Sequence, residues 1–233
     1  MGTISLEHSD RLYWLGRYTE RFFTAIKALG KQFDKMIGTA HSYTGYLEWF
    51  GLPDIYSDNR NYIRSMLFDT NNAYSAAYSL ERAYDNGIVL REEISTDSLS
   101  FLQMAKDTLS KADRSNNVRL ALLPLEDVVY SFRGSVNEHI YDDEIRNIIY
   151  IGKTVERPDL YMRMKYPYEN VRREYIRLLK NLNRVPKGTP FRYNTKYLSV
   201  PEISLGTIED YKSSTDDAID SLGHLFDTQE VMI

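Results

Sequence analysis

A single apolar stripe near the start of the chain constrains the fold most. Between about His8 and Met36, large apolar side chains recur at intervals of three and four residues, with Thr19 at the only polar step. The stripe consists of Leu12, Leu15, Phe22, Ile26, Leu29, Phe33 and Met36. Intervals of three and four match the 3.6 residues of one α-helical turn, whereas a strand requires alternation with a period of two. Since such alternation persists in no part of the chain, we predict an all-α fold.

Capping residues divide the rest of the chain into further helices. Ser57 or Asp58, the sequence Ser95-Thr96-Asp97, Asn116 or Asn117, and Asp142 or Asp143 are suited to helix N-termini, and Pro167 is suited to a first turn. Pro124 should kink or break the helix that contains it. The predicted helices cover residues 8–36, 58–68, 72–94, 97–112, 117–136, 143–164 and 167–183.

Two segments rich in proline and glycine interrupt this pattern. Residues 39–58 predict a loop with at most a short aromatic helix at 46–50, and Gly38 should end the first helix. Residues 185–206 predict an irregular strap, followed by a possible last helix at 208–226. The prediction is therefore a bundle of about seven to nine helices in one domain, residues 1–233, with an irregular Pro-containing segment near the C-terminus.

Composition excludes several classes of function. The net charge of −4 argues against a dedicated nucleic-acid-binding protein, although a local basic patch remains compatible with it. The chain has no cysteine, so disulfides, Cys-ligated zinc and thiol nucleophiles are excluded. It shows neither a signal peptide nor a stretch of 18 apolar residues, so we expect a cytoplasmic protein that does not enter a membrane.

The dipeptide Glu-Arg occurs three times within predicted helices, as Glu20-Arg21, Glu81-Arg82 and Glu156-Arg157. Adjacent residues lie about 100° apart around a helix, so the two members of a dipeptide cannot easily pair with each other. Each member must find a partner on another turn or another helix.

The helical angles place several of these charges on apolar faces. Glu156 and Arg163 fall within roughly 40° of Ile145, on the face that also holds Gly152. Arg91 falls among Ala73, Leu80 and Tyr84, and Glu20 falls beside Tyr13, Gly16 and Phe23, off the main stripe. A charge on an apolar face is costly unless it is paired, so we expect ion pairs between helices inside the bundle.

Two interpretations of these charges are open. They can form a structural network that fixes the register of the helices, or they can line a polar pocket in which surplus arginines hold an anionic group. A similar choice concerns the aromatic residues of the first helix, which form either core or a ligand box. These aromatic residues are Tyr13, Trp14, Tyr18, Phe22 and Phe23.

The same motifs resemble the alpha-E family, a bacterial helical family named for its recurring Glu-Arg motif. Residues 11–21, RLYWLGRYTER, are similar to the opening signature of that family. Residues 82–95 and 152–157, the latter followed by Asp159 and Arg163, are similar to its second and third motifs. Two positions depart from the pattern: Pro158 stands where a small residue is usual, and Leu99 stands near the place of a tryptophan. Pro158 should kink its helix just past the motif.

The resemblance implies a setting more than an activity. Family members are similar to proteins encoded beside, or fused to, ATP-grasp ligases and transglutaminase-like proteins, which implies the making, trimming or tagging of a peptide through amide bonds. The chain itself has no Walker-type loop, no HExxH motif and no nucleophile elbow. We therefore expect no cofactor and no metal, and a non-catalytic accessory or adaptor protein.

The alternative is an enzyme, or a binder of peptides or small molecules, that uses a pocket lined by Glu and Arg inside the bundle. The candidate polar network for binding comprises Arg17, Glu20, Arg21, Glu81, Arg82, Asn86, Arg91, Glu156, Arg157 and Arg163. The expected partners are an ATP-grasp ligase, a transglutaminase-like protein and a peptide or carboxylate ligand.

Overall fold

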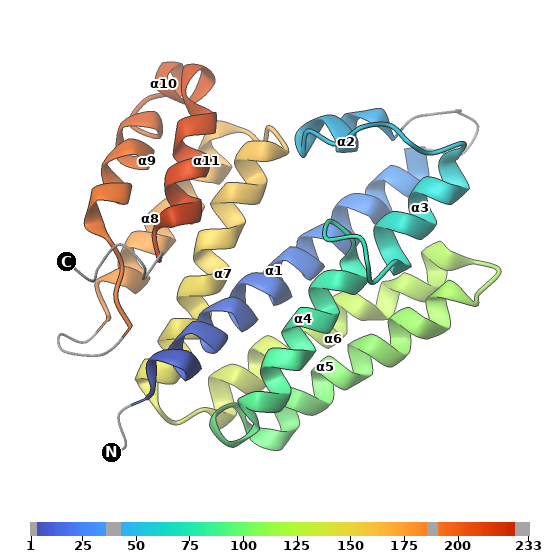
Figure 1. The fold of residues 1–233 in the computed structure, drawn as a ribbon, viewed down its shortest axis with the longest axis horizontal. Helices are drawn as coiled ribbons and strands as arrows, with labels where there is room; N and C mark the ends of the chain where they lie inside the picture. Colours follow the sequence, from blue (N-terminus) through green and yellow to red (C-terminus); the bar gives the residue numbers. More distant parts are fainter. Residues whose placement is uncertain (1–3, 36–42, 186–190, 227–233) are drawn as a thin grey trace.

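The computed structural model describes residues 4–35, 43–185 and 191–226, and over these residues the protein consists of helices and loops without strands (Figure 1). The all-α prediction is thus confirmed. The helices are α1 (Leu6–Lys35), α2 (Thr44–Trp49), α3 (Asn59–Phe68), α4 (Ala76–Val89), α5 (Arg91–Asp113), α6 (Val118–His139), α7 (Asp143–Arg163), α8 (Tyr168–Leu182), the 3-10 helix η1 (Thr195–Leu198), α9 (Ser199–Ser204), α10 (Ile208–Ser213) and α11 (Thr215–His224).

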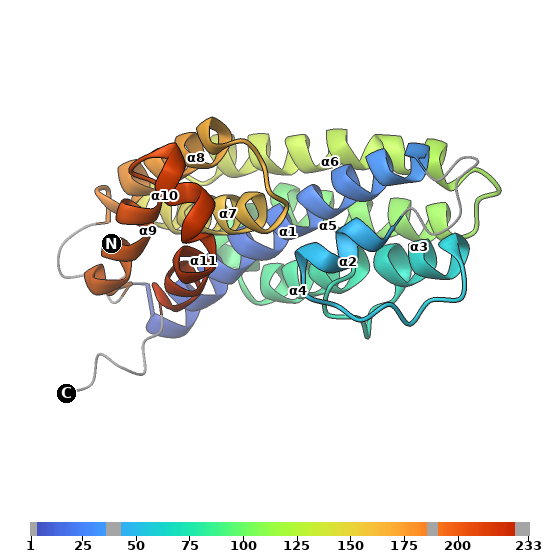
Figure 2. The ribbon, with the colours of Figure 1, turned by 90° about the horizontal axis from the view of Figure 1, so that it is seen from above.

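Helix α1 is the centre of the arrangement. It packs against α4 and α6 on one side and against α7 on the other, while α8–α11 gather around α7 (Figures 1 and 2). Two apolar clusters lie along α1: one surrounds Leu12 and Leu15 near α7 and α11, and the other surrounds Phe22, Ile26 and Leu29 near α2 and α3. The stripe predicted on the first helix is therefore core; Met36 and Gly38 lie outside the described residues.

Helices α1 and α7 cross at two glycines. Both helices rise from the lower left of Figure 1 and then diverge. A Cβ atom added to Gly16 would overlap the carbonyl oxygen of Ile149, and one added to Gly152 would overlap the carbonyl oxygen of Tyr13. The backbones thus touch directly at this crossing, which only glycine allows. This close approach brings the Glu-Arg dipeptides one turn further along within reach of each other.

Most predicted helix starts are confirmed. The side chains of Asp58, Asn117 and Asp142 each accept a hydrogen bond from the backbone N–H of a residue in the first turn that follows. Both prolines predicted to disturb helices lie inside continuous ones: Pro124 in the second turn of α6, and Pro158 in α7, which continues to Arg163. Of the two outcomes expected at Pro124, a kink or a break, the break is absent.

The predicted helix over residues 72–94 was wrong in its extent. Ser75 caps α4, which ends at Val89, and a new helix starts at Arg91. The predicted stop at Ser95 is present, because Ser95 has the left-handed φ of 71° and its hydroxyl accepts a hydrogen bond from the N–H of Ser98 (3.3 Å). The prediction that Arg91 lies on the same face as Ala73, Leu80 and Tyr84 assumed one continuous helix. Because the helix is interrupted at Leu90, that prediction was wrong.

The C-terminal region is more helical than predicted. The irregular strap expected over 185–206 contains η1 and α9, and its residues 186–190 lie outside the described part. The last helix expected over 208–226 is divided into α10 and α11, with Ser214 at the junction. Tyr168 and Tyr175 donate hydrogen bonds from their hydroxyls to the carbonyl oxygens of Leu205 and Leu198, so α8 holds this region in place.

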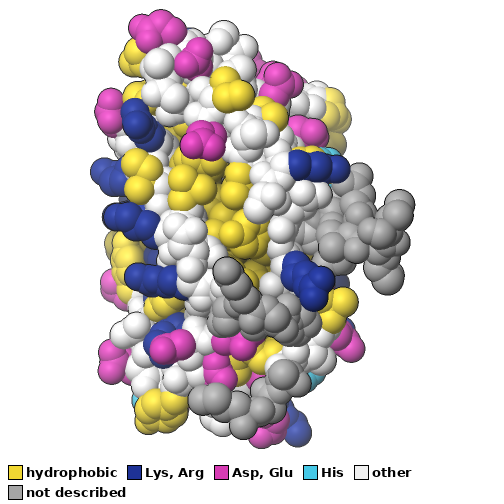
Figure 3. All heavy atoms as spheres, turned by 90° about the vertical axis from the view of Figure 1, so that its left-hand side faces the viewer, with side chains coloured by type: hydrophobic (Ala, Val, Ile, Leu, Met, Phe, Trp, Pro, Cys, Tyr) yellow, Lys and Arg dark blue, Asp and Glu magenta, His cyan; other side chains and the backbone are white. Residues whose placement is uncertain are grey.

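Positive charge gathers on the exposed face of α8, although the chain as a whole is acidic. Figure 3, which looks at the end of the molecule formed by α8–α11, shows Lys and Arg side chains along one border of a hydrophobic area. The exposed basic residues of α8 and the turn after it are Arg172, Arg173, Arg177, Lys180 and Arg184. In the described part of the chain, no helix is long and apolar enough to cross a membrane.

Candidate functional site

Two Glu-Arg dipeptides, one on α1 and one on α7, exchange partners across the helix crossing. Glu20 accepts hydrogen bonds from Arg157 Nε and Nη2 at 2.7 and 2.9 Å. Glu156 accepts hydrogen bonds from Arg21 Nε and Nη2 at 2.6 and 3.1 Å. Each pair is bidentate, which is the strongest geometry for a guanidinium and a carboxylate. The expected ion pairs between helices are confirmed for these two dipeptides.

Each of the two glutamates also binds a second arginine. Arg17 donates to Glu156 at 2.6 Å from the preceding turn of α1, and Arg133 of α6 donates to Glu20 at 2.6 Å. Both glutamate side chains are only 1% exposed. Two guanidinium groups therefore compensate each buried carboxylate, as a buried charge requires.

This surplus of positive charge determines how Glu156 ionises. Burial by itself opposes ionisation, but the nearby charges of Arg21 and Arg17 and their hydrogen bonds outweigh it and lower the pKa of Glu156 to about 2. Burial opposes the charged form of Arg17, but the neighbouring Tyr13, Glu156 and Asp159 outweigh burial and raise the pKa of Arg17. The Glu156–Arg17–Arg21 group is therefore fully ionised at neutral pH.

The network continues along α7 and into α8. Asp159 lies one turn after Glu156 and contacts Arg17 at 3.6 Å and Arg163 at 2.6 Å. Burial and the charge of Glu156 raise the pKa of Asp159, which makes this carboxyl the more easily protonated of the two. On the other side, Glu174 of α8 is buried and contacts Arg157 at 3.4 Å.

A solvent-accessible pocket opens directly onto this network. It has a volume of about 290 Å³ and lies between α1, α2, α7 and the loop before α4. Its charged lining residues are Arg21, Glu156, Asp159 and Arg163, and its other walls are Tyr46, Phe50, Tyr74, Ala25, Ala73, Leu160 and Met164. We call it the arginine pocket. Polar groups at one wall and aromatic rings at the others are typical of a small-ligand site.

The charged side chains that line the arginine pocket balance, and the buried Arg17 behind them adds one positive charge. The side chains of Arg21 and Arg163 are 29% and 37% exposed, so both are partly open to solvent. Together with Arg17 behind them, three cations face the two carboxylates of Glu156 and Asp159. An anionic group in the pocket would therefore meet a net charge of +1, and a carboxylate matches the parallel N–H donors of a guanidinium.

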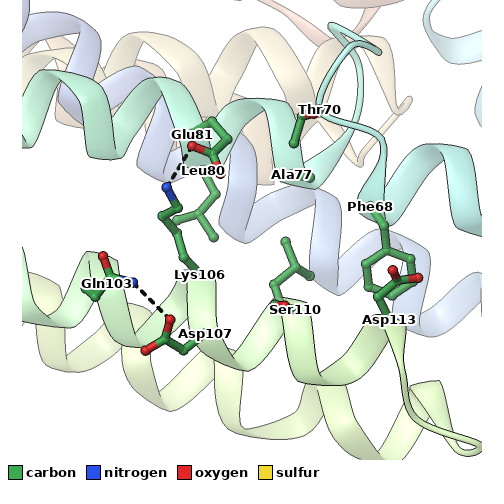
Figure 4. Close-up of a pocket in the computed structure, with 11 residues that line it drawn as sticks. Phe68, Thr70, Ala77, Leu80, Glu81, Gln103, Lys106, Asp107, Ser110 and Asp113 are labelled. Atoms are coloured by element: carbon green, nitrogen blue, oxygen red, sulfur yellow. Dashed lines mark hydrogen bonds and ion pairs between the residues drawn. The ribbon is translucent and has the colours of Figure 1, made fainter.

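The third dipeptide does not join this network. Glu81 pairs with Lys106 of α5 at 2.8 Å in a separate pocket of about 350 Å³, where Figure 4 shows the two side chains facing each other beside Gln103 and Asp107. Arg82 is half exposed and contacts Asp85 of its own helix at 3.7 Å. Glu81 and Arg82, which were included in the candidate polar network, therefore lie apart from the other two dipeptides, because α4 turns them toward α5 and solvent.

Arg91 and Asn86 also lie away from the buried network. Arg91 is 70% exposed and contacts only its neighbour Glu92 among the described ion pairs. Asn86 accepts a hydrogen bond from Arg11 at 3.5 Å. Including Arg91 in one polar interior was an error that follows from the wrong helix boundary at Leu90.

A second pocket lies further along α1 toward its N-terminus. It has a volume of about 330 Å³ and is lined by Glu7, Asp10, Arg11, Trp14, Tyr18, Arg82, Asp85 and Asn86. This N-terminal pocket collects residues from the first two motifs. It also divides the aromatic residues of the first helix, since Tyr13, Phe22 and Phe23 are buried core whereas Trp14 and Tyr18 are partly exposed and line the pocket.

The sequence patterns did not identify several residues of the site. Arg133 and Glu174 supply essential charges to the network, but no motif marks them, and their partners lie more than 110 and 15 residues away, respectively, in the sequence. Tyr46, Phe50 and Tyr74 come from segments expected to be loop or helix start. One signal was present: a glycine stands four residues before the glutamate in both buried dipeptides and not before Glu81.

Among the described residues, no group of three or more His, Asp or Glu side chains is placed to hold a metal ion.

Comparison with known proteins gives one family. Residues 8–177 match the family Alpha-E, described as "a predicted alpha-helical domain with a conserved ER motif". No curated protein and no solved structure matches the chain. The match covers most of the 233 residues and includes all three Glu-Arg dipeptides and both glycines of the helix crossing, so the chain belongs to the Alpha-E family.

Proposed function

We propose that this protein is a non-catalytic accessory protein that holds a peptide by a carboxylate group in the arginine pocket. The observation that carries the proposal is the partial exposure of the Arg21 and Arg163 side chains in a pocket whose charged lining, with the buried Arg17 behind it, sums to +1. Both side chains lie beside the aromatic walls of the pocket, where a ligand can reach them. Those walls suit the apolar part of a residue whose carboxylate lies on the arginines.

The buried part of the network supports a rigid site. Arg17 and Glu156 are almost fully buried and tie α1 to α7, so the guanidinium of Arg21 is oriented by its bidentate contact with Glu156. A pre-oriented donor loses less conformational freedom when a ligand binds. The network thus serves both structure and binding, which joins the two interpretations that the sequence left open.

We place this binding protein in an amide-bond system. The resemblance to the alpha-E family implies an ATP-grasp ligase and a transglutaminase-like protein as partners, and both classes act on amide bonds or the groups that form them. A carboxylate held on arginines is the group that a ligase would join to an amine. The accessory protein would present or receive that peptide, and the chemistry would occur in the partner.

A second candidate, an enzyme, is favoured by one observation. Asp159 lines the arginine pocket, and burial together with the charge of Glu156 raises the pKa of its carboxyl. A carboxyl group with a raised pKa is suited to proton transfer. Arg163 would then bind the substrate next to this acid or base.

Calorimetric titration tests the proposal. The probes are N-acetyl-Gly-Phe with a free carboxylate and the same dipeptide as its C-terminal amide. We expect the acid to bind and the amide to bind at least about tenfold more weakly, because hydrogen bonds to a charged group contribute about 1.5–3 kcal/mol. Equal affinity of the two probes, or no binding of either, would contradict the proposal.

Turnover by the isolated protein distinguishes the enzymatic candidate from the accessory role. We expect no hydrolysis of the dipeptide amide and no ATP hydrolysis by the protein alone. Turnover that is lost in Asp159→Asn and retained in the control Asp127→Asn, an exposed residue of α6, would replace the accessory role by an enzymatic one.

A further inference from the structure

One face of α1 connects the arginine pocket with the N-terminal pocket. Asp10, Trp14, Tyr18, Arg21 and Ala25 follow one another at intervals of four, four, three and four residues, so they lie on one face of the helix. Asp10, Trp14 and Tyr18 line the N-terminal pocket, and Arg21 and Ala25 line the arginine pocket. The two pockets are therefore neighbours along a single helix.

Neighbouring aromatic and arginine side chains lie between the two pockets. The rings of Trp14 and Tyr18 lie 5.3 Å apart, and the guanidinium of Arg21 lies 5.6 Å from the centre of the Tyr18 ring. All three side chains are partly exposed. Helix α4 packs beside α1 (Figures 1 and 2), and its residue Arg82 lines the N-terminal pocket. The result is an aromatic floor with α4 as one wall.

The two ends of this floor carry opposite charge. The arginine pocket with Arg17 has a net charge of +1, as described above. In the N-terminal pocket, the carboxylates are Glu7, Asp10 and Asp85, and the cations are Arg11 and Arg82, which gives −1. Arg11 contacts Glu7 at 3.0 Å and Arg82 contacts Asp85 at 3.7 Å, so both arginines already have acidic partners. Asp10 forms no ion pair among the described residues, and its carboxylate is hydrogen-bonded to the side chain of Trp14 on the same face.

The spacing of these charges defines the length of a ligand. Asp10 and Arg21 are eleven residues apart in α1, which corresponds to roughly 16 Å at 1.5 Å per residue. An extended peptide spans about 3.3–3.6 Å per residue. Four or five residues would therefore reach from one charged end to the other.

We infer that the ligand is a short peptide with a free amino terminus, which lies extended along α1 with its carboxylate in the arginine pocket and its ammonium group at Asp10 in the N-terminal pocket. This inference rests on the proposed function, because it extends the ligand from the same carboxylate site. The aromatic floor of Trp14 and Tyr18 contacts the middle of the peptide and does not require a particular sequence there.

Calorimetry with three probes tests this inference. The tetrapeptide Gly-Ala-Gly-Phe carries both charges, its N-acetylated form lacks the ammonium group, and N-acetyl-Gly-Phe carries the carboxylate alone. We expect the free tetrapeptide to bind roughly two- to fivefold more tightly than its acetylated form, as for an ion pair at an exposed site. Equal affinity of the free and acetylated tetrapeptides would overturn the inference.

Variants locate the ammonium group. Asp10→Asn should remove the advantage of the free tetrapeptide and leave the binding of N-acetyl-Gly-Phe unchanged, whereas Asp127→Asn on α6 should change neither. An advantage that persists in Asp10→Asn would place the ammonium group elsewhere and overturn the inference. If N-acetyl-Gly-Phe binds but the amine adds nothing, only this inference fails. If N-acetyl-Gly-Phe does not bind, the proposed function fails with it.

Discussion

Gly16 of α1 and Gly152 of α7 are each seated against the carbonyl oxygen of the residue three positions before the other, Ile149 and Tyr13. The crossing is thus built from two similar halves. Four residues after each glycine stands the glutamate that binds the arginine of the other helix. The pattern glycine, three residues, Glu-Arg therefore specifies both the contact of the backbones and the exchange of charges above it.

The glycine crossing gives the first prediction. Gly16→Ala or Gly152→Ala should destabilise the fold by at least about 1–3 kcal/mol, because the added methyl group overlaps a backbone oxygen that cannot move independently. The control is Gly134→Ala in α6, where an added Cβ meets nothing within 4 Å. Alanine there should be neutral or stabilise by up to about 1 kcal/mol. Urea unfolding measures both; equal effects at Gly16 and Gly134 would contradict the close crossing.

The buried ion pairs give the second prediction. Glu156→Ala should destabilise by about 3–5 kcal/mol, since it leaves Arg17 buried beside Arg21 without their shared carboxylate. Glu81→Ala is the matched control, because it removes the glutamate of the third dipeptide from a partly exposed pair with Lys106 and should cost about 0–1 kcal/mol. Urea melts that shift equally for the two variants would show that Glu156 is not a buried partner.

Acid stability gives the third prediction. The pKa of Glu156 is lowered from its ordinary value of 4.5 to about 2 in the folded state, so its stabilising effect is complete above about pH 5 and is lost as the pH falls toward 2. Asp159 has the opposite effect on the pH dependence of stability. Its pKa is raised in the folded state, so the folded state takes up a proton at Asp159 at a higher pH than the unfolded state does. Glu156→Gln should therefore lose less stability than the wild type between pH 5 and 2. Urea unfolding at stepwise pH checks this; parallel curves would refute it.

The fourth prediction concerns Lys153, next to Gly152 on α7. Burial, followed by the charges of Arg133 and Arg157, lowers the pKa of this amine to about 8. A neutral amine is the reactive form, so Lys153 should be acetylated by acetic anhydride with a midpoint near pH 8. Exposed lysines such as Lys180 and Lys212 serve as internal controls in the same mass-spectrometric experiment. A midpoint for Lys153 equal to theirs would contradict the prediction.

The sequence predicted the helical class and much of the buried network for a physical reason. Periodicity reports which face of a helix is buried, and it correctly placed Glu20 and Glu156 inside. Periodicity fails where the predicted helix boundary is wrong: because the helix ends before Leu90, Arg91 lies on the surface. The Glu-Arg pattern alone also could not distinguish Glu81 from the two buried glutamates.

What the sequence could not predict depends on contacts between distant segments. Arg133 reaches Glu20 from α6, and Tyr46 and Tyr74 close the arginine pocket from segments that only the tertiary fold brings together. Helical angles define faces within one helix, but they do not define which helix lies opposite. The glycines four residues before Glu20 and Glu156 carried part of this information, because a residue without a side chain on a buried face allows another backbone to approach.

A thermodynamic cycle tests the central claim, that a carboxylate lies on the exposed arginines of the arginine pocket. The affinities of N-acetyl-Gly-Phe and its amide are measured by calorimetry for the wild type and for Arg163→Gln. Arg163 is 37% exposed, so its replacement should leave the fold intact, which a thermal melt verifies. The control is Arg192→Gln, an exposed arginine that does not line the pocket.

We predict that the wild type and Arg192→Gln prefer the acid by about tenfold or more, and that Arg163→Gln loses most of this preference while binding the amide as before. The ratio of the two affinities is the decisive quantity, because a general loss of structure would weaken both probes alike. An undiminished preference for the acid in Arg163→Gln, or no preference in the wild type, would contradict the account.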